Sequence, residues 1–322
     1  MAEDPQPPSV ERSGTVAIVG RSNVGKSTLL NAALAMPLAI VSRKPQTTRQ
    51  NLLGVVRHAG AEIILLDTPG LHRPTARLGK EMNRAARSAA KTADVVVFMT
   101  SLPPKPRAGL EPHAGDLRLL KELGEDQPVV LVVNKVDLAK DKTILLPLMQ
   151  RLHDEREFAA VVPISALKDD GVKLVLAEVA KLLPEGTAQF DEDTLTDRPL
   201  RWFVTEYVRE PILTSTSQEV PHAVAVTVER YDDPPQGGTV TIHATVHVER
   251  DGQKRIVIGN KGAVLKKIGI RARQRIEELL DRKVNLQLFV RVTPDWRDKP
   301  QLLSDFGLIA GLDGEPLTGD GS

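Results

Sequence analysis

Short apolar runs separated by polar or glycine-rich segments set the pattern of the first half of the chain. Amphipathic segments lie between the runs, which is typical of a sheet buried on both faces by crossover helices. The runs span residues 16–19, 63–66, 95–99, 129–133 and 161–164. Residues 14–186 are therefore predicted to form a doubly wound α/β domain that binds its ligands beyond the carboxyl ends of the strands.

The pattern changes after this half. Residues 187–199 are polar, rich in Asp and Thr and without apolar periodicity, so they predict a linker. Residues 200–298 then show the order helix, strand, strand, helix, helix, strand, which predicts a smaller α+β domain. The helical segments expected there are 200–209 and 255–280, and the strands are 223–229, 239–248 and 284–292. Residues 1–13 are expected to be a disordered tail, and 299–322 a C-terminal tail.

Length and composition agree with two domains. A chain of 322 residues can bury a separate core in each of them. It contains no cysteine, which excludes disulfides and thiolate metal sites and fits a reducing cytoplasm. No run approaches the roughly 20 apolar residues that span a bilayer, and no signal-peptide pattern occurs at the N-terminus. The expectation is a soluble, cytoplasmic monomer.

Charge is distributed unevenly along the chain although the formal net charge is only +1. Between residues 250 and 275 there are nine Lys and Arg side chains and a single acidic one, Asp251, so this segment carries +8 and the rest of the chain −7. A segment of this kind favours a polyanion as its partner. The alternative for part of it is a solvated helix face.

Residues 20–27, Gly-Arg-Ser-Asn-Val-Gly-Lys-Ser, fit the phosphate-binding loop and stand between a predicted strand and the helical stretch 28–36. The glycines let successive backbone N–H groups converge on a phosphate at a helix N-terminus. Lys26 would neutralise the β and γ oxygens of a nucleotide, and Ser27 would hold Mg²⁺. Taken alone, the pattern could also be a glycine turn with an exposed lysine.

Two further loops follow strands in the same domain. Residues 67–70, Asp-Thr-Pro-Gly, supply a carboxylate suited to a water-mediated hold on Mg²⁺ and a Gly70 N–H that can sense a γ-phosphate. Residues 134–137, Asn-Lys-Val-Asp, predict that the bound nucleotide carries guanine. Asp137 can accept from N1–H and from the exocyclic amine of guanine, a donor pair that adenine lacks. Residues 165–167, Ser-Ala-Leu, can offer a backbone N–H to the guanine O6.

The sequence therefore predicts a GTP site. Its residues are Gly20, Arg21, Ser22, Asn23, Val24, Gly25, Lys26, Ser27, Thr28, Asp67, Thr68, Pro69, Gly70, Leu71, Asn134, Lys135, Val136, Asp137, Ser165, Ala166 and Leu167. An ATPase is disfavoured by Asp137. A protein in which the nucleotide is only a structural ligand of an RNA chaperone remains an alternative.

Residues 42–49, Ser-Arg-Lys-Pro-Gln-Thr-Thr-Arg, resemble the effector loop of the Era family of bacterial ribosome-assembly GTPases. In that family a threonine of this loop closes on Mg²⁺ when GTP is bound. The resemblance assigns this role to Thr48, with Thr47 as the alternative. The predicted Mg²⁺ ligands are then Ser27, Thr48 and Asp67, and the predicted catalytic residues are Lys26, Asn23, Thr48 and Gly70.

Leu71 follows the Asp-Thr-Pro-Gly motif, where signalling GTPases carry a glutamine that orients the attacking water. A leucine cannot do this, so hydrolysis is expected to be slow or to be assisted by another charge. In related GTPases with an apolar residue here, the resemblance implies a potassium ion held by an asparagine of the phosphate loop. Asn23 matches that position, and a cap of the loop is its alternative role.

Residues 259–262, Gly-Asn-Lys-Gly, lie between two helical segments inside the +8 segment and have the Gly-x-x-Gly arrangement of a KH domain. Two glycines allow close backbone approach to a sugar-phosphate chain, and Ile258, Val264 and Ile268 are expected to line an apolar groove for bases. A helix end followed by a turn is the alternative. The predicted RNA-binding residues are Lys254, Arg255, Ile258, Gly259, Asn260, Lys261, Gly262, Lys266 and Lys267.

The element order around this loop resembles the bacterial-type (type II) KH fold, and the resemblance to the Era family covers residues 14–296. It implies a GTPase switch that binds the 3′ region of small-subunit ribosomal RNA and acts in maturation of the 30S subunit. Peripheral contact with the cell membrane is a further partner that the resemblance allows. Ser22 departs from the family, which often has Pro there.

Overall fold

The computed structural model describes residues 10–309 except 43, 45, 73, 108, 217, 218 and 236. The predicted tail up to residue 9, the effector-loop residues Arg43 and Pro45, and the chain from 310 on lie outside the described residues. The described chain forms two compact units. One contains the residues up to 39 together with 48–72 and 82–197, and the other contains 40–47, 73–81 and the residues from 198 on.

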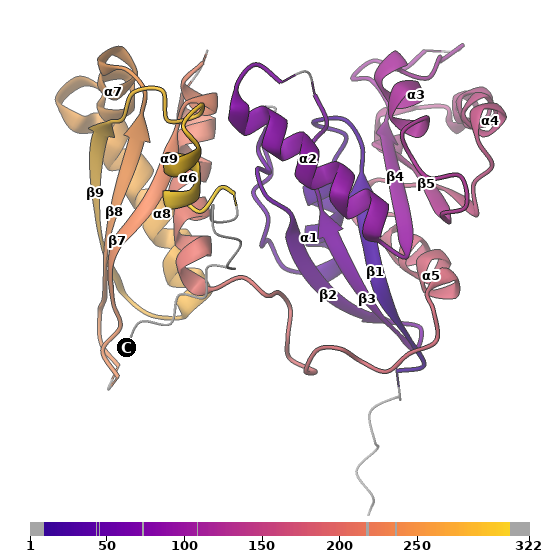
Figure 1. Ribbon diagram of the computed structural model, residues 1–322, viewed down its shortest axis with the longest axis horizontal. Helices are drawn as coiled ribbons and strands as arrows, with labels where there is room; N and C mark the ends of the chain where they lie inside the picture. The colour runs from indigo at the N-terminus through magenta and orange to yellow at the C-terminus, as the bar shows by residue number, and fades with distance from the viewer. Residues whose placement is uncertain are drawn as a thin grey trace, which may run out of the picture. The chain divides into compact units, whose positions relative to one another are not determined.

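A six-stranded sheet in the order β2-β3-β1-β4-β5-β6 organises the described part of the first unit (Figure 1). Its strands are β1 (Arg12–Val19), β2 (Leu52–His58), β3 (Ala61–Asp67), β4 (Val95–Ser101), β5 (Val129–Asn134) and β6 (Ala160–Pro163). All neighbouring pairs are parallel except β2 with β3. The predicted doubly wound fold is confirmed, but the edge strand β2 was not anticipated, because only part of it is apolar.

Helices cover both faces of this sheet, as the apolar runs predict. They are α1 (Lys26–Leu34), α2 (Arg77–Thr92), α3 (Ala114–Leu120), α4 (Leu145–Glu155) and α5 (Val172–Leu182). Alternate residues of the strands, such as Ala17 and Phe98, join buried side chains of α2, α3 and α4 in one apolar cluster. On the other face α1 and α5 pack against each other and against β3. Burial on both faces explains why the strands are almost continuously apolar.

Residues of the predicted linker are bonded to the first unit along strand β2. The Val55 N–H donates to the Leu195 carbonyl at 2.9 Å. The carboxylate of Glu62 is fully buried, and it accepts from the Gln189 N–H at 2.6 Å and from the Ser13 hydroxyl at 3.1 Å. A buried carboxylate requires such partners, because without them its desolvation would be costly. The segment up to Asp197 therefore belongs to the first unit.

The second unit has the predicted α+β order, with helices packed on a three-stranded sheet. Its elements are α6 (Leu200–Ser215), β7 (Ala225–Asp232), β8 (Val240–Val248), α7 (Asp251–Ile258), α8 (Ala263–Leu280), β9 (Val284–Val292) and α9 (Pro300–Asp305). Strand β8 is central, antiparallel to β7 and parallel to β9. Alternate residues of β8, such as Val246, point into an apolar core formed with Val208 of α6 and with Ile268 and Ala272 of α8.

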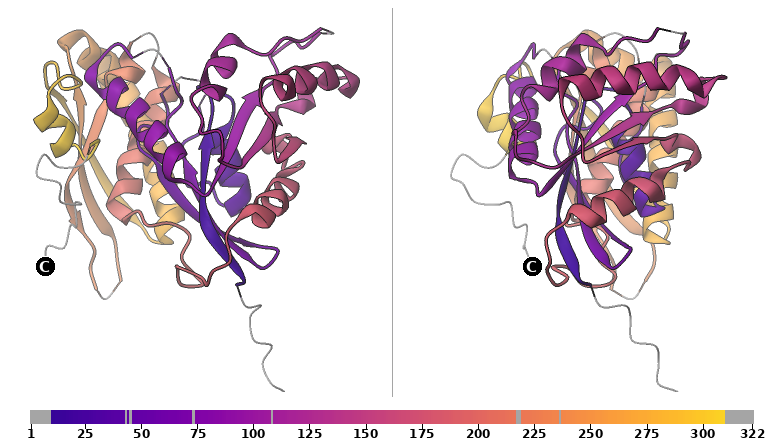
Figure 2. Two further views of the ribbon diagram at one scale, coloured as in Figure 1. Left: turned by 45° about the vertical axis from the view of Figure 1, so that its right-hand side comes forward. Right: turned by 90° about the vertical axis from the view of Figure 1, so that its right-hand side faces the viewer.

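The short C-terminal helix α9 covers part of the opposite face of this sheet, where sequence analysis expected only a tail (Figure 2). Trp296 is fully buried and donates from Nε1 to the Ala223 carbonyl at 3.1 Å. The ring of Phe306 lies 4.3 Å from that of His247, centroid to centroid. Leu303 of α9 is also fully buried in this packing, which the sequence pattern did not predict because only a few apolar residues take part.

His247 is buried under this cover between two hydroxyls. Its Nε2 lies 2.9 Å from Oγ1 of Thr227, and its Nδ1 lies 3.0 Å from Oγ1 of Thr293. Burial lowers the pKa of His247 to about 4, an effect that Glu229 opposes and Arg291 reinforces. The imidazole is therefore neutral in the folded protein at neutral pH.

This lowered pKa predicts a loss of stability in mild acid. In the unfolded chain His247 takes up its proton near the ordinary histidine pKa, whereas in the folded chain it does so only near the lowered pKa. Acid therefore favours unfolding in the pH range between these two pKa values. We expect His247→Gln to remove on the order of 1 kcal/mol of the stability difference between pH 7 and pH 5. Urea unfolding followed by tryptophan fluorescence measures it, since Trp202 and Trp296, the two tryptophans, both belong to the second unit.

His243→Gln, on the same strand, is the matched control. Its stability is measured at the same two pH values. An unchanged pH dependence in His247→Gln would contradict the assignment to His247.

Candidate functional site

The phosphate-loop residues connect β1 to α1 in the way their glycines require. Gly25 stands at the N-terminus of α1 with φ of 109°, in a region that favours glycine. A β-carbon at Gly25 would lie 2.2 Å from Nδ2 of Asn134, so no other residue fits this position. The Asn134 amide donates to the Val24 carbonyl at 2.8 Å. The loop is therefore held open for a phosphate at a helix N-terminus.

Lys26 lies inside this loop with only 6 % of its surface exposed. Its ammonium donates to the carbonyls of Gly20 and Arg21, each at 3.1 Å. Burial lowers the pKa of Lys26 to about 8, and the nearby Asp67 opposes this shift. A phosphate anion in the loop would favour the charged form of this side chain.

The three residues predicted to hold Mg²⁺ converge on one point. Ser27 donates to Oδ2 of Asp67 at 2.6 Å, and Thr48 donates to the same oxygen at 3.1 Å. The two hydroxyl oxygens lie 2.8 Å apart. The alternative Thr47 instead donates to the Lys44 carbonyl at 2.7 Å. Of the two threonines, the structure therefore brings Thr48 to Ser27 and Asp67.

Asp67 has the properties of a carboxylate that is able to bind a cation. It is fully buried at the end of β3, and its Oδ1 has no hydrogen-bond partner among the described residues. Burial raises its pKa, against the effects of Lys26, Ser27 and Thr48. Hydroxyl and carboxylate oxygens are the donors that Mg²⁺ prefers.

Asn134 and Ser165 bring together the two guanine loops, residues 134–137 and 165–167. The Asn134 side chain accepts from the Ala166 N–H at 3.0 Å, and the Ser165 hydroxyl donates to Asp137 at 2.7 Å. The ammonium of Lys135 donates to the Asn23 carbonyl at 2.6 Å, which joins this loop to the phosphate loop. Burial lowers the pKa of Lys135, and Arg21 lowers it further. The four predicted motifs thus form one continuous site.

Sequence analysis missed the residues that fix Arg21. Asp116, at the start of α3, is fully buried and accepts from Nε of Arg21 at 2.7 Å and from its guanidinium NH2 at 3.1 Å. The Thr100 hydroxyl donates to the same carboxylate at 2.7 Å. Asp116 lies outside every recognisable motif, so only its burial reveals this role.

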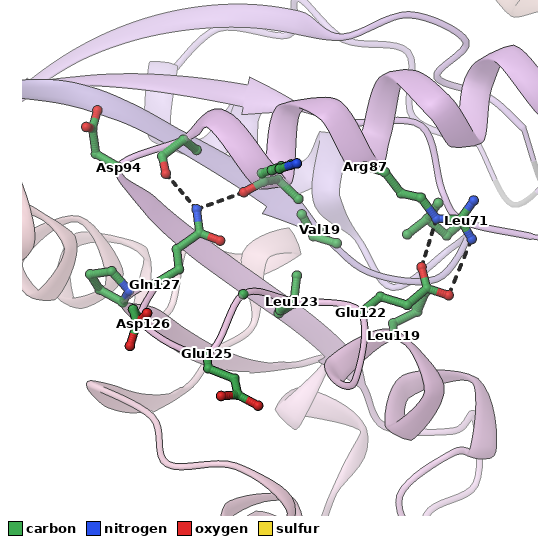
Figure 3. Close-up of a pocket in the computed structure, with 15 residues that line it drawn as sticks. Val19, Leu71, Arg87, Asp94, Leu119, Glu122, Leu123, Glu125, Asp126 and Gln127 are labelled. Atoms are coloured by element: carbon green, nitrogen blue, oxygen red, sulfur yellow. Dashed lines mark hydrogen bonds and ion pairs between the residues drawn. The ribbon is translucent and has the colours of Figure 1, made fainter.

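Leu71 packs against the apolar cluster of the first unit, and its backbone forms a β-bridge with Arg21 of the phosphate loop. It lines an open hollow of about 750 Å³ between α2 and the connection from α3 to β5 (Figure 3). An ion pair between Arg87 and Glu122, 2.8 Å long, closes one side of this hollow, and Gln127 donates to two carbonyls at the end of α2 on the other. The leucine side chain has no donor or acceptor with which to orient a water at the phosphates.

The Gly-Asn-Lys-Gly residues form a tight turn between α7 and α8 in the second unit. A β-carbon at Gly259 would lie 2.4 Å from Cγ2 of Val264, whereas one at Gly262 would meet nothing within 4 Å. Both glycines have positive φ, 72° and 78°. Gly259 is therefore required for packing, while Gly262 leaves open space on the surface for a close approach.

Most of the predicted RNA-binding side chains lie at the surface of this unit. Arg255, Asn260, Lys261, Lys266 and Lys267 are exposed, and Lys254 and Ile258 are half-buried. The expectation that Ile268 lines a groove is wrong, because this side chain is fully buried in the apolar core. Half-buried apolar residues packed beside that core include Val264, Leu286 and Leu288.

Two family models match the chain in agreement with this division. Residues 15–135 match the family described as 50S ribosome-binding GTPase, and residues 219–297 match the KH domain family. GTPase Era of Geobacter sp. strain M21 is 45% identical over 92% of this chain and 97% of its own length. GTPase Era of Ruminiclostridium cellulolyticum is 42% identical over the same shares of the two chains.

Solved structures give the same result. A crystal structure of an Aquifex aeolicus Era variant bound to GDP and AlF4− has a TM-score of 0.86 and 39% identity, with 92% of this chain and 99% of that chain covered. An Era structure in complex with MgGDPNP and nucleotides 1506–1542 of 16S ribosomal RNA has the same TM-score and coverage and 38% identity. The nucleotide motifs, the KH domain and these relatives together show that this chain is a GTPase and belongs to the Era family.

Proposed function

We propose that this GTPase is a Mg²⁺-dependent switch that binds the 3′ region of small-subunit ribosomal RNA and acts in assembly of the 30S subunit. The observation that carries the switch is the contact of Thr48 with Ser27 and Asp67, because it joins the effector loop to the phosphate loop. The proposal places the protein in the cytoplasm as a monomer. No helix within the described ranges is long and apolar enough to cross a membrane.

Mg²⁺ fits the residues that are present. Ser27 and Thr48 would hold it through their hydroxyls, and Asp67 has a buried oxygen without a partner in the described structure. When bound, the ion neutralises charge on the β and γ oxygens of the nucleotide. The relative solved with MgGDPNP supports this assignment.

Two groups can report the γ-phosphate to the rest of the domain. Thr48 lies on the effector loop, and the Gly70 N–H lies three residues after Asp67. Both loops are expected to be ordered while the γ-phosphate is present and released after hydrolysis. This order-to-disorder change would be the signal that the GTPase sends.

RNA binding is supported by the surface of the second unit. Gly262 leaves room for a sugar-phosphate backbone, and Lys261 beside it supplies positive charge at an exposed position. The excess of positive charge between residues 250 and 275 strengthens any contact with phosphates. The RNA bound to the Era relative, nucleotides 1506–1542 of 16S ribosomal RNA, suggests the corresponding region as the target.

Asp137→Asn should weaken GTP binding about 10- to 100-fold, because an amide cannot accept both guanine donors as the carboxylate does. The same variant should bind a xanthine nucleotide better than the parent chain does, since xanthine carries a carbonyl where guanine carries its amine. Titration with fluorescent nucleotides measures both affinities. Asp141→Asn, an exposed aspartate in the same loop region, is the control and should change neither.

Hydrolysis should be at least about ten-fold faster in potassium than in sodium if Asn23 holds a potassium ion that stabilises the developing charge. Asn23 has φ of 64°, so Asn23→Gly removes the amide at a backbone position that glycine adopts readily. We expect this variant to hydrolyse GTP equally slowly in both salts. Equal rates for the parent chain in potassium and sodium would count against the ion site.

The first experiment on the whole proposal is GTP hydrolysis in potassium buffer with and without an RNA that matches the 3′ end of small-subunit ribosomal RNA. We expect RNA to raise the rate, and ATP not to be hydrolysed. Asn260→Asp combined with Lys261→Asp should weaken binding of this RNA about ten-fold or more, because two carboxylates then face the phosphates. Lys283→Asp, an exposed lysine of the same unit outside the 250–275 segment, is the matched control.

If the RNA binds and leaves the rate unchanged, direct coupling between RNA and hydrolysis is excluded. If it fails to bind the parent chain, the RNA assignment itself is wrong. Filter binding at two salt concentrations separates the second result from weak binding caused by ionic strength.

A further inference from the structure

One hydroxyl of the phosphate loop has no hydrogen-bond partner in the described part of the chain. Oγ of Ser22 is enclosed, with almost no surface exposed to solvent, and makes no hydrogen bond to any described residue. A buried hydroxyl without a partner is destabilising, so native proteins rarely leave one in this state without a reason. At a ligand site, the usual reason is a bond to the ligand.

Ser22 lies where the phosphate loop meets the loop that follows Asp67. A β-carbon at Gly70 would be 2.6 Å from Cα of Ser22 and 2.7 Å from its Oγ, so the serine packs directly on the Gly70 backbone. A β-bridge between Arg21 and Leu71 fixes the two loops against each other on one side of this contact. The hydroxyl is therefore held beside the backbone group expected to sense the γ-phosphate.

Neighbouring side chains of the loop are already committed to other contacts. Arg21 is bound to Asp116, and the Lys26 ammonium lies 3.1 Å from the Gly20 and Arg21 carbonyls, beside the same turn. The N–H groups at the start of α1 lie at the opposite end of the loop sequence and suit the other phosphates. Of these groups, the Ser22 hydroxyl is the donor that remains for an acceptor next to Gly70.

We propose that the Ser22 hydroxyl donates a hydrogen bond to an oxygen of the γ-phosphate and thereby helps this protein to distinguish GTP from GDP. A hydrogen bond from a neutral hydroxyl to a phosphate anion is charge-assisted and stronger than one between neutral groups. GDP offers no γ oxygen, so its binding does not gain from this donor. The proline that the Era family often carries at this position cannot donate such a bond, so relatives with that proline lack this contact.

Ser22→Ala tests this proposal. Its affinity for a hydrolysis-resistant GTP analogue with Mg²⁺ should fall about ten-fold, while its affinity for GDP should stay within about two-fold of the parent value. Ser22→Cys keeps the size of the side chain but donates only weakly. Its affinity for the GTP analogue should therefore lie between those of Ser22→Ala and the parent chain. Ser88→Ala, an exposed serine on α2, is the matched control and should bind both nucleotides as the parent chain does.

Equal losses for the GTP analogue and GDP would mean that Ser22 only shapes the loop, and unchanged affinities would mean that its hydroxyl meets no phosphate; either result overturns the proposal. Thermal unfolding without nucleotide detects any general damage to the fold. Should Ser22→Ala not fold, Ser22→Cys supplies the same comparison. Because the readout is a ratio of two affinities, it is independent of RNA binding and of the rate of hydrolysis.

Discussion

The nucleotide site depends on one buried amide, the side chain of Asn134 at the end of β5. It donates to the phosphate loop at Val24 and accepts from the guanine loop at Ala166, so it holds together two segments that are far apart in the sequence. Gly25 leaves the space that this amide fills. Both bonds are buried, where a hydrogen bond is strong and a missing partner is costly. The positions of the phosphate loop and of the guanine loop therefore both depend on the Asn134 side chain.

Two charged side chains of the nucleotide site are buried in the same domain as this amide. Lys26 and Asp67 are both enclosed, and burial shifts their pKa values in opposite directions, each toward the neutral form. Oδ1 of Asp67 and Oγ of Ser22 are both buried and have no hydrogen-bond partner in the described structure. Burial of such groups without partners costs free energy, and a bound anion or cation that pairs with them would offset this cost.

The second unit combines an apolar core with many positive charges at its surface. Its apolar residues form one face of the sheet together with α6 and α8, and the C-terminal aromatic pair Trp296 and Phe306 covers part of the other. Lysine and arginine then remain at the surface of α7 and α8, beside a turn that two glycines shape. A glycine turn with exposed positive charges around it suits a ligand recognised by its backbone.

The sequence by itself determined the alternation of strands and helices, the four nucleotide motifs and the Gly-Asn-Lys-Gly turn, because these depend on local periodicity and on spacing within short segments. It did not reveal strand β2, helix α9, the role of Asp116 or the burial of Ile268, because these depend on partners distant in the chain. Tertiary structure likewise places the Thr48 hydroxyl, and not that of Thr47, next to Asp67, which the sequence does not show. Local patterns determine which elements form. Long-range packing decides which side chains are enclosed, and this enclosure raises the pKa of Asp67.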